Sequence, residues 1–226
     1  MQDHRPSSQS MTSGQLSRAE ALACSGYRYA CHVMLYSDTK TQLFGRIPIR
    51  HIILMQMRFD GLLGFPGGLV NPSEETLEAG LSRELLEELG VALPISVEDH
   101  VDSCHAPSSS PSSSSHLITH FYVKKMEEEQ IREVERAAVS TATDHGQEVL
   151  GMVRVPLYTT KSLASFLSHS FICNARAQLV DSLLRFNLVA PEELHKALTH
   201  SLKIHTHTAE DLQAALMLTE AKRKRF

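Results

Sequence analysis

Residues 64–91 read GFPGGLVNPSEETLEAGLSRELLEELGV, and this stretch decides the fold. The close spacing of glycine and proline around FPGG predicts irregular backbone over residues 58–72. From Glu74 the apolar residues follow a helical period as far as Gly90. A glycine at that point fits the left-handed position that ends a helix. We therefore expect a loop, a helix and a second loop, in that order.

Three carboxylates gather on one side of this expected helix. At about 100° per residue, Glu84, Glu87 and Glu88 lie at about 0°, 300° and 40°. Such like charges repel one another by about 0.2–0.5 kcal/mol per pair, and no lysine four residues away compensates them. Carboxylates clustered without thiols or several imidazoles suit a hard cation. The pattern therefore favours Mg²⁺ or Mn²⁺ and a reaction on phosphates.

The residues beside the trio are suited to holding the loop against the helix. Arg83 lies eight residues after Glu75, so that a fork between the two can brace the loop at Gly67 and Gly68. Glu87 is also within one helical turn of Arg83. The glycine pair lets a backbone carbonyl come close to a metal ion, where a Cβ would interfere.

The rest of the chain predicts a single α/β domain in which helices enclose one mixed sheet. Strands are expected at 30–36, 47–57, 96–102, 117–124 and 148–156. Helices are expected from Ser17 onward and at 126–140, 160–168, 174–187, 191–200 and 209–224. The strand at 47–57 is almost continuously apolar, which is typical of a central strand.

Three polar segments set the expected boundaries. Residues 1–16 are too poor in apolar side chains to order themselves, and residues 17–188 form the domain. The serine-rich stretch 103–115 reads as a flexible inserted loop, either a spacer or a site of regulated phosphorylation. Residues 189–226 form a helical extension with a basic end at 222–225, which suits a solubilising helix terminus, a nuclear-localisation signal or an RNA contact.

The composition narrows the class of protein. With 226 residues, 42% of them hydrophobic, and a net charge of −4, the chain fits one globular domain and not a strongly basic nucleic-acid coat. The four cysteines contain no C-x-x-C pair, which argues against a disulfide framework or a thiolate zinc site. No apolar run approaches the roughly 20 residues of a membrane span. We expect a soluble, intracellular protein.

The helix and its loops resemble a known motif. Gly68, Glu75, Arg83–Leu85, Glu87–Glu88 and Gly90–Val91 are similar to the Nudix box, the metal-binding loop–helix–loop of hydrolases that cleave nucleoside diphosphates linked to another group. One extra residue separates Gly68 from Glu75, where the family usually has five. The resemblance implies metal ligation by the carboxylate trio and structural roles for four residues: Gly68, Glu75, Arg83 and Gly90.

A closer resemblance covers about residues 17–188. It rests on ACH at 30–32, LFGRIPIR at 43–50, MQMRFDGLLGFPGG at 55–68, DHGQEVLGMVRVPLY at 144–158 and FI…AR.QL at 171–179. These segments are similar to a Nudix branch that contains a small nucleolar RNA decapping enzyme, which also hydrolyses inosine and deoxyinosine diphosphate. The branch also contains a degenerate sister of the syndesmos type, which has lost box glutamates and binds RNA and a tudor-domain DNA-repair adaptor. The branch implies a homodimer in the nucleus, the nucleolus included, and in the cytoplasm.

The same resemblance assigns roles outside the trio. It implies that the Gly67 carbonyl and Glu148 are further metal ligands, with Glu148 an alternative to Glu88 as the base that activates water. It implies substrate contacts by four residues: His32, Arg58, Phe65 and Gln178. Taken alone, His32 would be a core histidine and Phe65 a core phenylalanine, whereas the resemblance makes them contacts to the base. With no tryptophan in the chain, a cap site built as a tryptophan sandwich is excluded.

These expectations combine into a reaction. Mg²⁺ or Mn²⁺ at the carboxylates would neutralise a diphosphate and activate water, and Arg58 would help to stabilise the leaving phosphate. The expected substrates are capped RNA and inosine-type diphosphates. The main alternative is a binding protein that keeps the box but acts by holding RNA or a repair adaptor. A third possible function is that of a Nudix enzyme for sugar nucleotides or dinucleoside polyphosphates.

Overall fold

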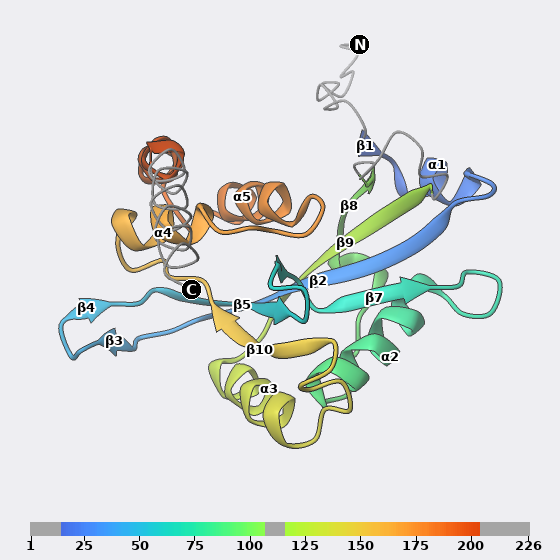
Figure 1. Ribbon diagram of the computed structural model, residues 1–226, viewed down its shortest axis with the longest axis horizontal. Helices are drawn as coiled ribbons and strands as arrows, with labels where there is room; N and C mark the ends of the chain where they lie inside the picture. The colour runs from blue at the N-terminus through green and yellow to red at the C-terminus, as the bar shows by residue number, and fades with distance from the viewer. Residues whose placement is uncertain (1–14, 107–115, 204–226) are drawn as a thin grey trace, which may run out of the picture.

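The computed structural model describes residues 15–106 and 116–203 (Figure 1). Its main sheet has the strand order β1-β8-β9-β2-β5-β10, in which β2 and β9 run parallel and the other neighbours antiparallel. Two short strands join it, because β6 pairs with β5 and β7 with β2. The strands are β1 (Gln15–Leu16), β2 (Arg28–Asp38), β5 (His51–Arg58), β6 (Leu63–Gly64), β7 (Gly67–Val70), β8 (His100–His105), β9 (Leu117–Lys125) and β10 (Val149–Arg154). The predicted mixed sheet is confirmed.

Helices cover both faces of the sheet, as Figure 1 shows. They are α1 (Arg18–Ala23), α2 (Leu77–Leu89), α3 (Glu128–Ser140), α4 (Thr160–Leu167) and α5 (Ala175–Arg185), followed by a helical segment at 191–203. Strand β2 shows why both faces are covered, since Val33 and Leu35 pack with α2 and α3 while Met34 and Tyr36 pack with α4 and α5. The central strands are therefore apolar on both sides, and the α/β sandwich predicted from the sequence is confirmed.

The ends of the helices follow the expected local signals. Ser17 caps α1 in a capping box with Glu20. Helix α2 ends at Gly90, whose φ of 69° lies in the left-handed region. It starts later than predicted, because Thr76 and not a residue near Glu74 provides the N-cap. Leu194 in the segment 191–203 belongs to the same core as α5, so the described part of the extension packs on the domain.

Several strand predictions were wrong. The expected strand 47–57 is divided into β4 (Ile47–Pro48) and β5, and β4 forms a separate hairpin with β3 (Gln42–Leu43). The irregular segment 58–72 contains β6, which pairs with the preceding strand β5, and β7, which pairs with the distant strand β2. The expected strand 96–102 starts as a 3₁₀ turn (Val97–Asp99), and β8 then extends to His105, into the predicted serine-rich loop. Strand β7 depends on a partner far away in the sequence, which local patterns do not report.

The predicted terminal segments are only partly described. Gln15 and Leu16, at the end of the segment expected to lack structure, form β1 on the edge of the sheet. Residues 107–115 of the serine-rich loop, the helix expected at 209–224 and the basic end lie outside the described residues. In the described part of the chain, no helix has the length and apolarity to cross a membrane.

Candidate active site

The glycine pair that begins β7 comes close to both β2 and α2. In the antiparallel pairing of β2 with β7, Gly67 lies opposite His32. Gly67 has a φ of 126°, and a Cβ there would collide with the backbone oxygen of Cys31. A Cβ on Gly68 would collide with the Glu84 carboxylate. Gly67 therefore allows the close approach to β2, and Gly68 leaves room for the Glu84 carboxylate where it now lies.

Arg83 ties the loop to the helix. Its Nη2 donates to Oε1 of Glu75 at 3.0 Å and to the Leu69 carbonyl at 3.3 Å, while its Nη1 donates to Oε1 of Glu84 at 2.8 Å. The hydrogen bond from Arg83 lowers the pKa of Glu75 below its usual value. The expected fork between Arg83 and Glu75 is thus present despite the extra residue in the loop.

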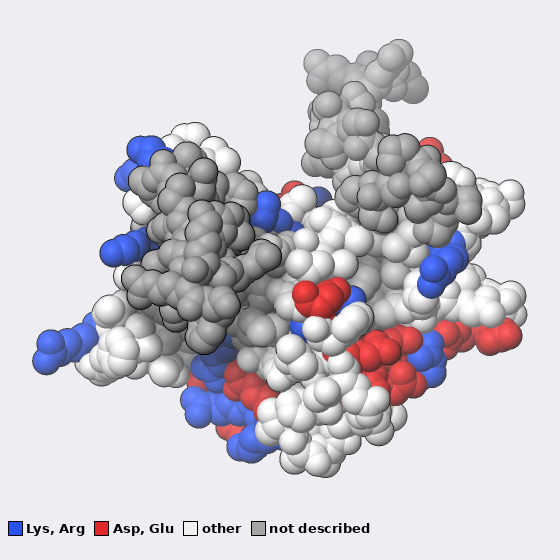
Figure 2. Space-filling model, viewed as in Figure 1, with Lys and Arg blue, Asp and Glu red and all other residues white. Residues whose placement is uncertain are grey.

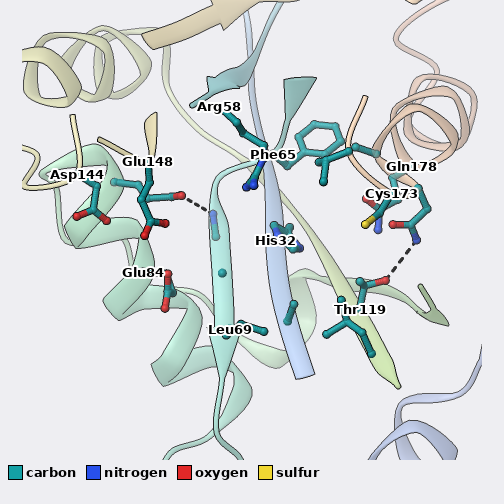
Figure 3. A pocket seen from close by; sticks show the side chains of 18 of the residues that line it. His32, Arg58, Phe65, Leu69, Glu84, Thr119, Asp144, Glu148, Cys173 and Gln178 are labelled. Atoms are coloured by element: carbon teal, nitrogen blue, oxygen red, sulfur yellow. Dashed lines mark hydrogen bonds between the residues drawn. The ribbon is translucent and has the colours of Figure 1, made fainter. Parts of the chain in front are cut away.

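Five carboxylates line one wall of a cavity of about 540 Å³. Figure 3 shows the cavity, and Figure 2 shows acidic side chains gathered over α2. The five are Glu84, Glu87, Glu88, Asp144 and Glu148. Among the described residues, however, no three acidic, histidine or cysteine side chains are arranged so that they could hold one ion. Instead, the Arg83 guanidinium donates a hydrogen bond to Glu84 and a longer one, of 3.5 Å, to Glu87. The two carboxylates are thus paired with a positively charged side chain.

Glu88 is the most deeply buried of the five. Only 4% of the residue is exposed. Its Oε2 accepts a hydrogen bond from the Gly67 backbone N–H at 2.7 Å, and its Oε1 accepts one from the Gln56 amide at 3.0 Å. Burial raises the pKa of Glu88 to about 7, against the opposing effect of these two donors, and the charge of Glu84 raises it further.

Glu84 shows the same influence of burial. Its pKa is raised mainly by burial, and the charges of Glu87 and Glu148 raise it further, whereas Arg83 lowers it. Carboxylates that are desolvated and crowded in this way gain from a cation placed among them. Carboxylate and carbonyl oxygens are the ligands that hard divalent cations such as Mg²⁺ and Mn²⁺ prefer, so the chemistry of this donor set fits such an ion.

The opposite wall gathers the four residues for which the resemblance implied substrate contacts. His32 comes from β2, Arg58 from the end of β5, Phe65 from the link between β6 and β7, and Gln178 from α5 (Figure 3). Three regions that are far apart in the sequence, β2, the segment from Arg58 to Phe65 and α5, thus meet at one cavity. Ile172 and Cys173, which precede α5, complete this side.

The four residues differ in how free they are to bind a ligand. Phe65 is 2% exposed and packs against Phe121 with 4.9 Å between ring centroids, so most of its ring belongs to the core. Burial and the charge of Arg58 lower the pKa of His32 to about 4, which makes it neutral at neutral pH. Arg58 forms an ion pair with Asp60 at 3.1 Å.

Gln178 stands out on this wall because its amide nitrogen is unsatisfied. The residue is 8% exposed, and its buried Nε2 finds no hydrogen-bond partner among the described residues. A buried donor without a partner costs free energy unless something else accepts its hydrogen bond. Since Gln178 lines the cavity, a ligand acceptor would remove this cost.

The structure adds residues that the sequence reasoning missed. Asp144 precedes Glu148 by four residues and faces the same cavity, a spacing of two acids that local inspection could have flagged. Gln56 interrupts the apolar run at 52–57 of β5, and this interruption was a signal that the sequence offered. Thr119 and Asn174, joined by a hydrogen bond of 3.3 Å, line the same cavity, and no local pattern in the sequence indicated them.

A glycine loop braced by arginine against a helix whose carboxylates face a cavity is the arrangement of a Nudix hydrolase. The family model described as "Nudt16-like: U8 snoRNA-decapping enzyme-like" matches residues 29–189. The chain belongs to this Nudt16-like family of Nudix hydrolases. Nudix hydrolases generally use divalent metal ions.

Named relatives fall into two groups. The U8 snoRNA-decapping enzyme of Xenopus laevis is 42% identical over 84% of this chain and 90% of its own length, and that of Ovis aries is 48% identical over 78% and 91%. The Tudor-interacting repair regulator protein of Homo sapiens is 42% identical over 89% and 94%. Among solved structures, the Nudix domain of Shewanella oneidensis NrtR with ADP-ribose has a TM-score of 0.48 and 19% identity over 77% of this chain and 100% of that chain.

Proposed function

We propose that the protein is a decapping hydrolase that cleaves the diphosphate linkage of capped small nucleolar RNA and of mRNA caps, and that it also converts inosine and deoxyinosine diphosphate to the monophosphates. The observation that carries the proposal is the two-sided cavity. One wall presents five carboxylates, and the other presents Arg58 and the Gln178 amide nitrogen, which has no partner among the described residues. The names of the U8 snoRNA-decapping relatives support capped RNA as a substrate.

The proposed cofactor is Mg²⁺ or Mn²⁺. Once bound, such an ion neutralises the diphosphate and lowers the pKa of a coordinated water. The residues that would hold the ions are the Gly67 carbonyl, Glu84, Glu87, Glu88 and Glu148.

The chain's own side chains supply the remaining steps. Glu88, held by two hydrogen-bond donors, or else Glu148, accepts the proton of the attacking water. Arg58 exchanges Asp60 for a substrate phosphate and stabilises the leaving group. Neutral His32, Gln178 and the exposed part of Phe65 bind the nucleoside.

A panel of hydrolysis assays tests the proposal. Purified protein with Mn²⁺ is expected to release the methylguanosine nucleotide from capped RNA and to produce monophosphate from inosine and deoxyinosine diphosphate. Dinucleoside polyphosphates and nucleotide sugars serve as the comparison substrates. Turnover of these alone would replace the proposed substrates with another Nudix class.

A second function is favoured by one specific observation, the 42% identity to the human Tudor-interacting repair regulator. In that alternative the chain has little or no activity and binds RNA and a tudor-domain DNA-repair adaptor. Capture of a tudor domain by the pure protein, together with absent hydrolysis, would favour it. The retention of Glu84, Glu87 and Glu88 supports the hydrolase.

The proposal extends to assembly and location. We propose a homodimer that acts in the nucleus, including the nucleolus, and in the cytoplasm. Light scattering on the purified chain is expected to give twice the monomer mass, and imaging of a tagged chain is expected to show nuclear and nucleolar signal. A monomer mass, or a signal excluded from the nucleus, would contradict these two statements.

A further inference from the structure

Gln56 is a buried polar residue within residues 52–57 of β5, a run that is otherwise apolar. The residues before it in β5, Ile52 to Met55, are at most 1% exposed and belong to the two cores. Gln56 is also only 1% exposed. Burying an amide at such a place costs free energy unless its hydrogen bonds are made, so its contacts show why the residue is there.

The amide of Gln56 is only half satisfied. Its Nε2 donates to Oε1 of Glu88 at 3.0 Å, whereas its Oε1 is buried and has no partner among the described residues. A methionine, as at Met55 next to it, would fill a similar volume without an unpaired oxygen. Stability of the sheet alone therefore gives no reason for a glutamine here, and the reason must lie in its one partner.

That partner needs to be held from outside. Rotation about the last bond of a glutamate side chain has no sharp preferred angle, so neighbouring groups decide how the carboxylate of Glu88 is turned. Two donors from different strands do so: the Gly67 N–H of β7 fixes one oxygen, and Gln56 of β5 fixes the other. Gln56 does not line the cavity, whereas Glu88 does. Any effect of Gln56 on a bound ligand therefore passes through Glu88.

We infer that Gln56 is a positioning residue for the hydrolysis, whose amide holds the Glu88 carboxylate in the rotation that presents its free lone pairs to the cavity. The inference rests on the proposed role of Glu88 in metal binding and catalysis. Partners of metal ligands that bind no metal themselves typically contribute 10–100-fold to metal affinity or activity.

The test is Gln56→Met in the full chain, measured with inosine diphosphate and saturating Mn²⁺. We expect kcat to fall by about 10–100-fold, while KM for the nucleotide stays within about twofold because Gln56 does not touch the cavity. Calorimetry without nucleotide should show weaker Mn²⁺ binding. In a Glu88→Gln background the same substitution should change kcat by less than about twofold, since the residue acts only through Glu88.

Two further variants separate positioning from folding. Gln56→Asn keeps an amide that is one methylene too short to reach Glu88, and it should lower kcat as Gln56→Met does. Ser182→Ala is the matched control, because Ser182 Oγ is another buried oxygen without a partner among the described residues and lies away from the cavity lining. It should keep the wild-type kcat and Mn²⁺ affinity.

Each failure has a distinct meaning. Wild-type kcat and Mn²⁺ affinity in Gln56→Met, or an equal loss of kcat with and without Glu88, would overturn the role of Gln56 and leave the proposed function intact. A wild-type chain that shows no Mn²⁺-dependent turnover would contradict the proposed function. In that case, the Mn²⁺ affinities of the wild type and of Gln56→Met, measured without nucleotide, would still decide whether Gln56 positions Glu88.

Discussion

The two ends of helix α2 each place a glutamate where little water reaches, yet the two glutamates have different surroundings. At the start of the helix, Oε1 of Glu78 lies 2.7 Å from the Arg18 guanidinium and accepts a hydrogen bond from the Tyr122 hydroxyl at 2.8 Å. At the other end, Glu88 has no cation of its own among the described contacts and is held by two uncharged donors.

The difference separates a structural charge from a functional one. Glu78 joins α1, α2 and β9 through groups that satisfy its charge. Glu88 stands beside Glu84, and its pKa is raised by burial. A buried carboxylate paired with a cation, as at Glu78, is compatible with stability, whereas a buried carboxylate without a cation, as at Glu88, costs free energy. The carboxylate that is poorly compensated is therefore the one expected to carry chemistry.

The largest expected effect tests this at Glu88. Glu88→Gln should lower kcat for inosine diphosphate by about 10³-fold, since a general base or metal ligand is lost. The free energy of unfolding of the metal-free protein should not fall, because a neutral amide removes the cost of burying a charge. Steady-state kinetics and urea titrations measure the two quantities. Equal kcat values for variant and wild type would place the chemistry elsewhere.

The opposite outcome is expected at Glu78. Glu78→Met leaves Arg18 and the Tyr122 hydroxyl without their acceptor, and it should lower the free energy of unfolding by about 3 kcal/mol. The kcat and the Mn²⁺ affinity of the folded fraction should stay within about twofold. Arg18→Met serves as the partner variant, and the double variant should cost less than the two single losses added together. A variant that loses turnover but keeps its stability would break the distinction between the two ends.

The sequence predicted α2 and its acidic face because both depend on local periodicity. It did not predict Gln56 as a site residue, because its partner Glu88 is 32 residues away. Strand β7 was expected to be irregular, since its glycines have low strand propensity and only the pairing with β2 makes them a strand. The wall formed by His32, Arg58, Phe65 and Gln178 comes from three distant regions of the chain. Only the resemblance to a family, and no local pattern, pointed to it.

A smaller effect concerns pH at the Glu78 end. His120 lies beside His100 and Tyr29 and shares a hydrogen bond of 2.8 Å with the Ser103 hydroxyl. Burial lowers its pKa to about 4; the charges of His100 and Arg18 lower it further, whereas Glu78 raises it. A folded-state pKa below the unfolded value of about 6.5 contributes stability above pH 6.5, and this stability is lost as the pH falls towards 4.

The measurement compares urea unfolding at pH 7 and pH 5. Between these values the wild type should lose about 2 kcal/mol through His120, and His120→Phe should lose correspondingly less. The pKa of His32 is lowered as well, so this residue also makes stability fall towards pH 5. Its contribution is the same in the wild type and in His120→Phe and cancels when the two are compared. Identical pH dependences would show that His120 is not held neutral by its surroundings.

The smallest expected effect concerns Gln178, outside α2, whose buried Nε2 has no partner within 15–106 and 116–203. If this group is kept for a ligand, Gln178→Met should raise KM for inosine diphosphate by about tenfold, the typical cost of about 1.4 kcal/mol for one lost hydrogen bond. The kcat and the Mn²⁺ affinity should be unchanged, because the carboxylates lie on the other wall. The melting temperature should not fall, since the variant removes an unpaired donor. A lower melting temperature with an unchanged KM would make Gln178 a packing residue of α5, and an incompletely partnered group would then no longer indicate a ligand contact on this wall.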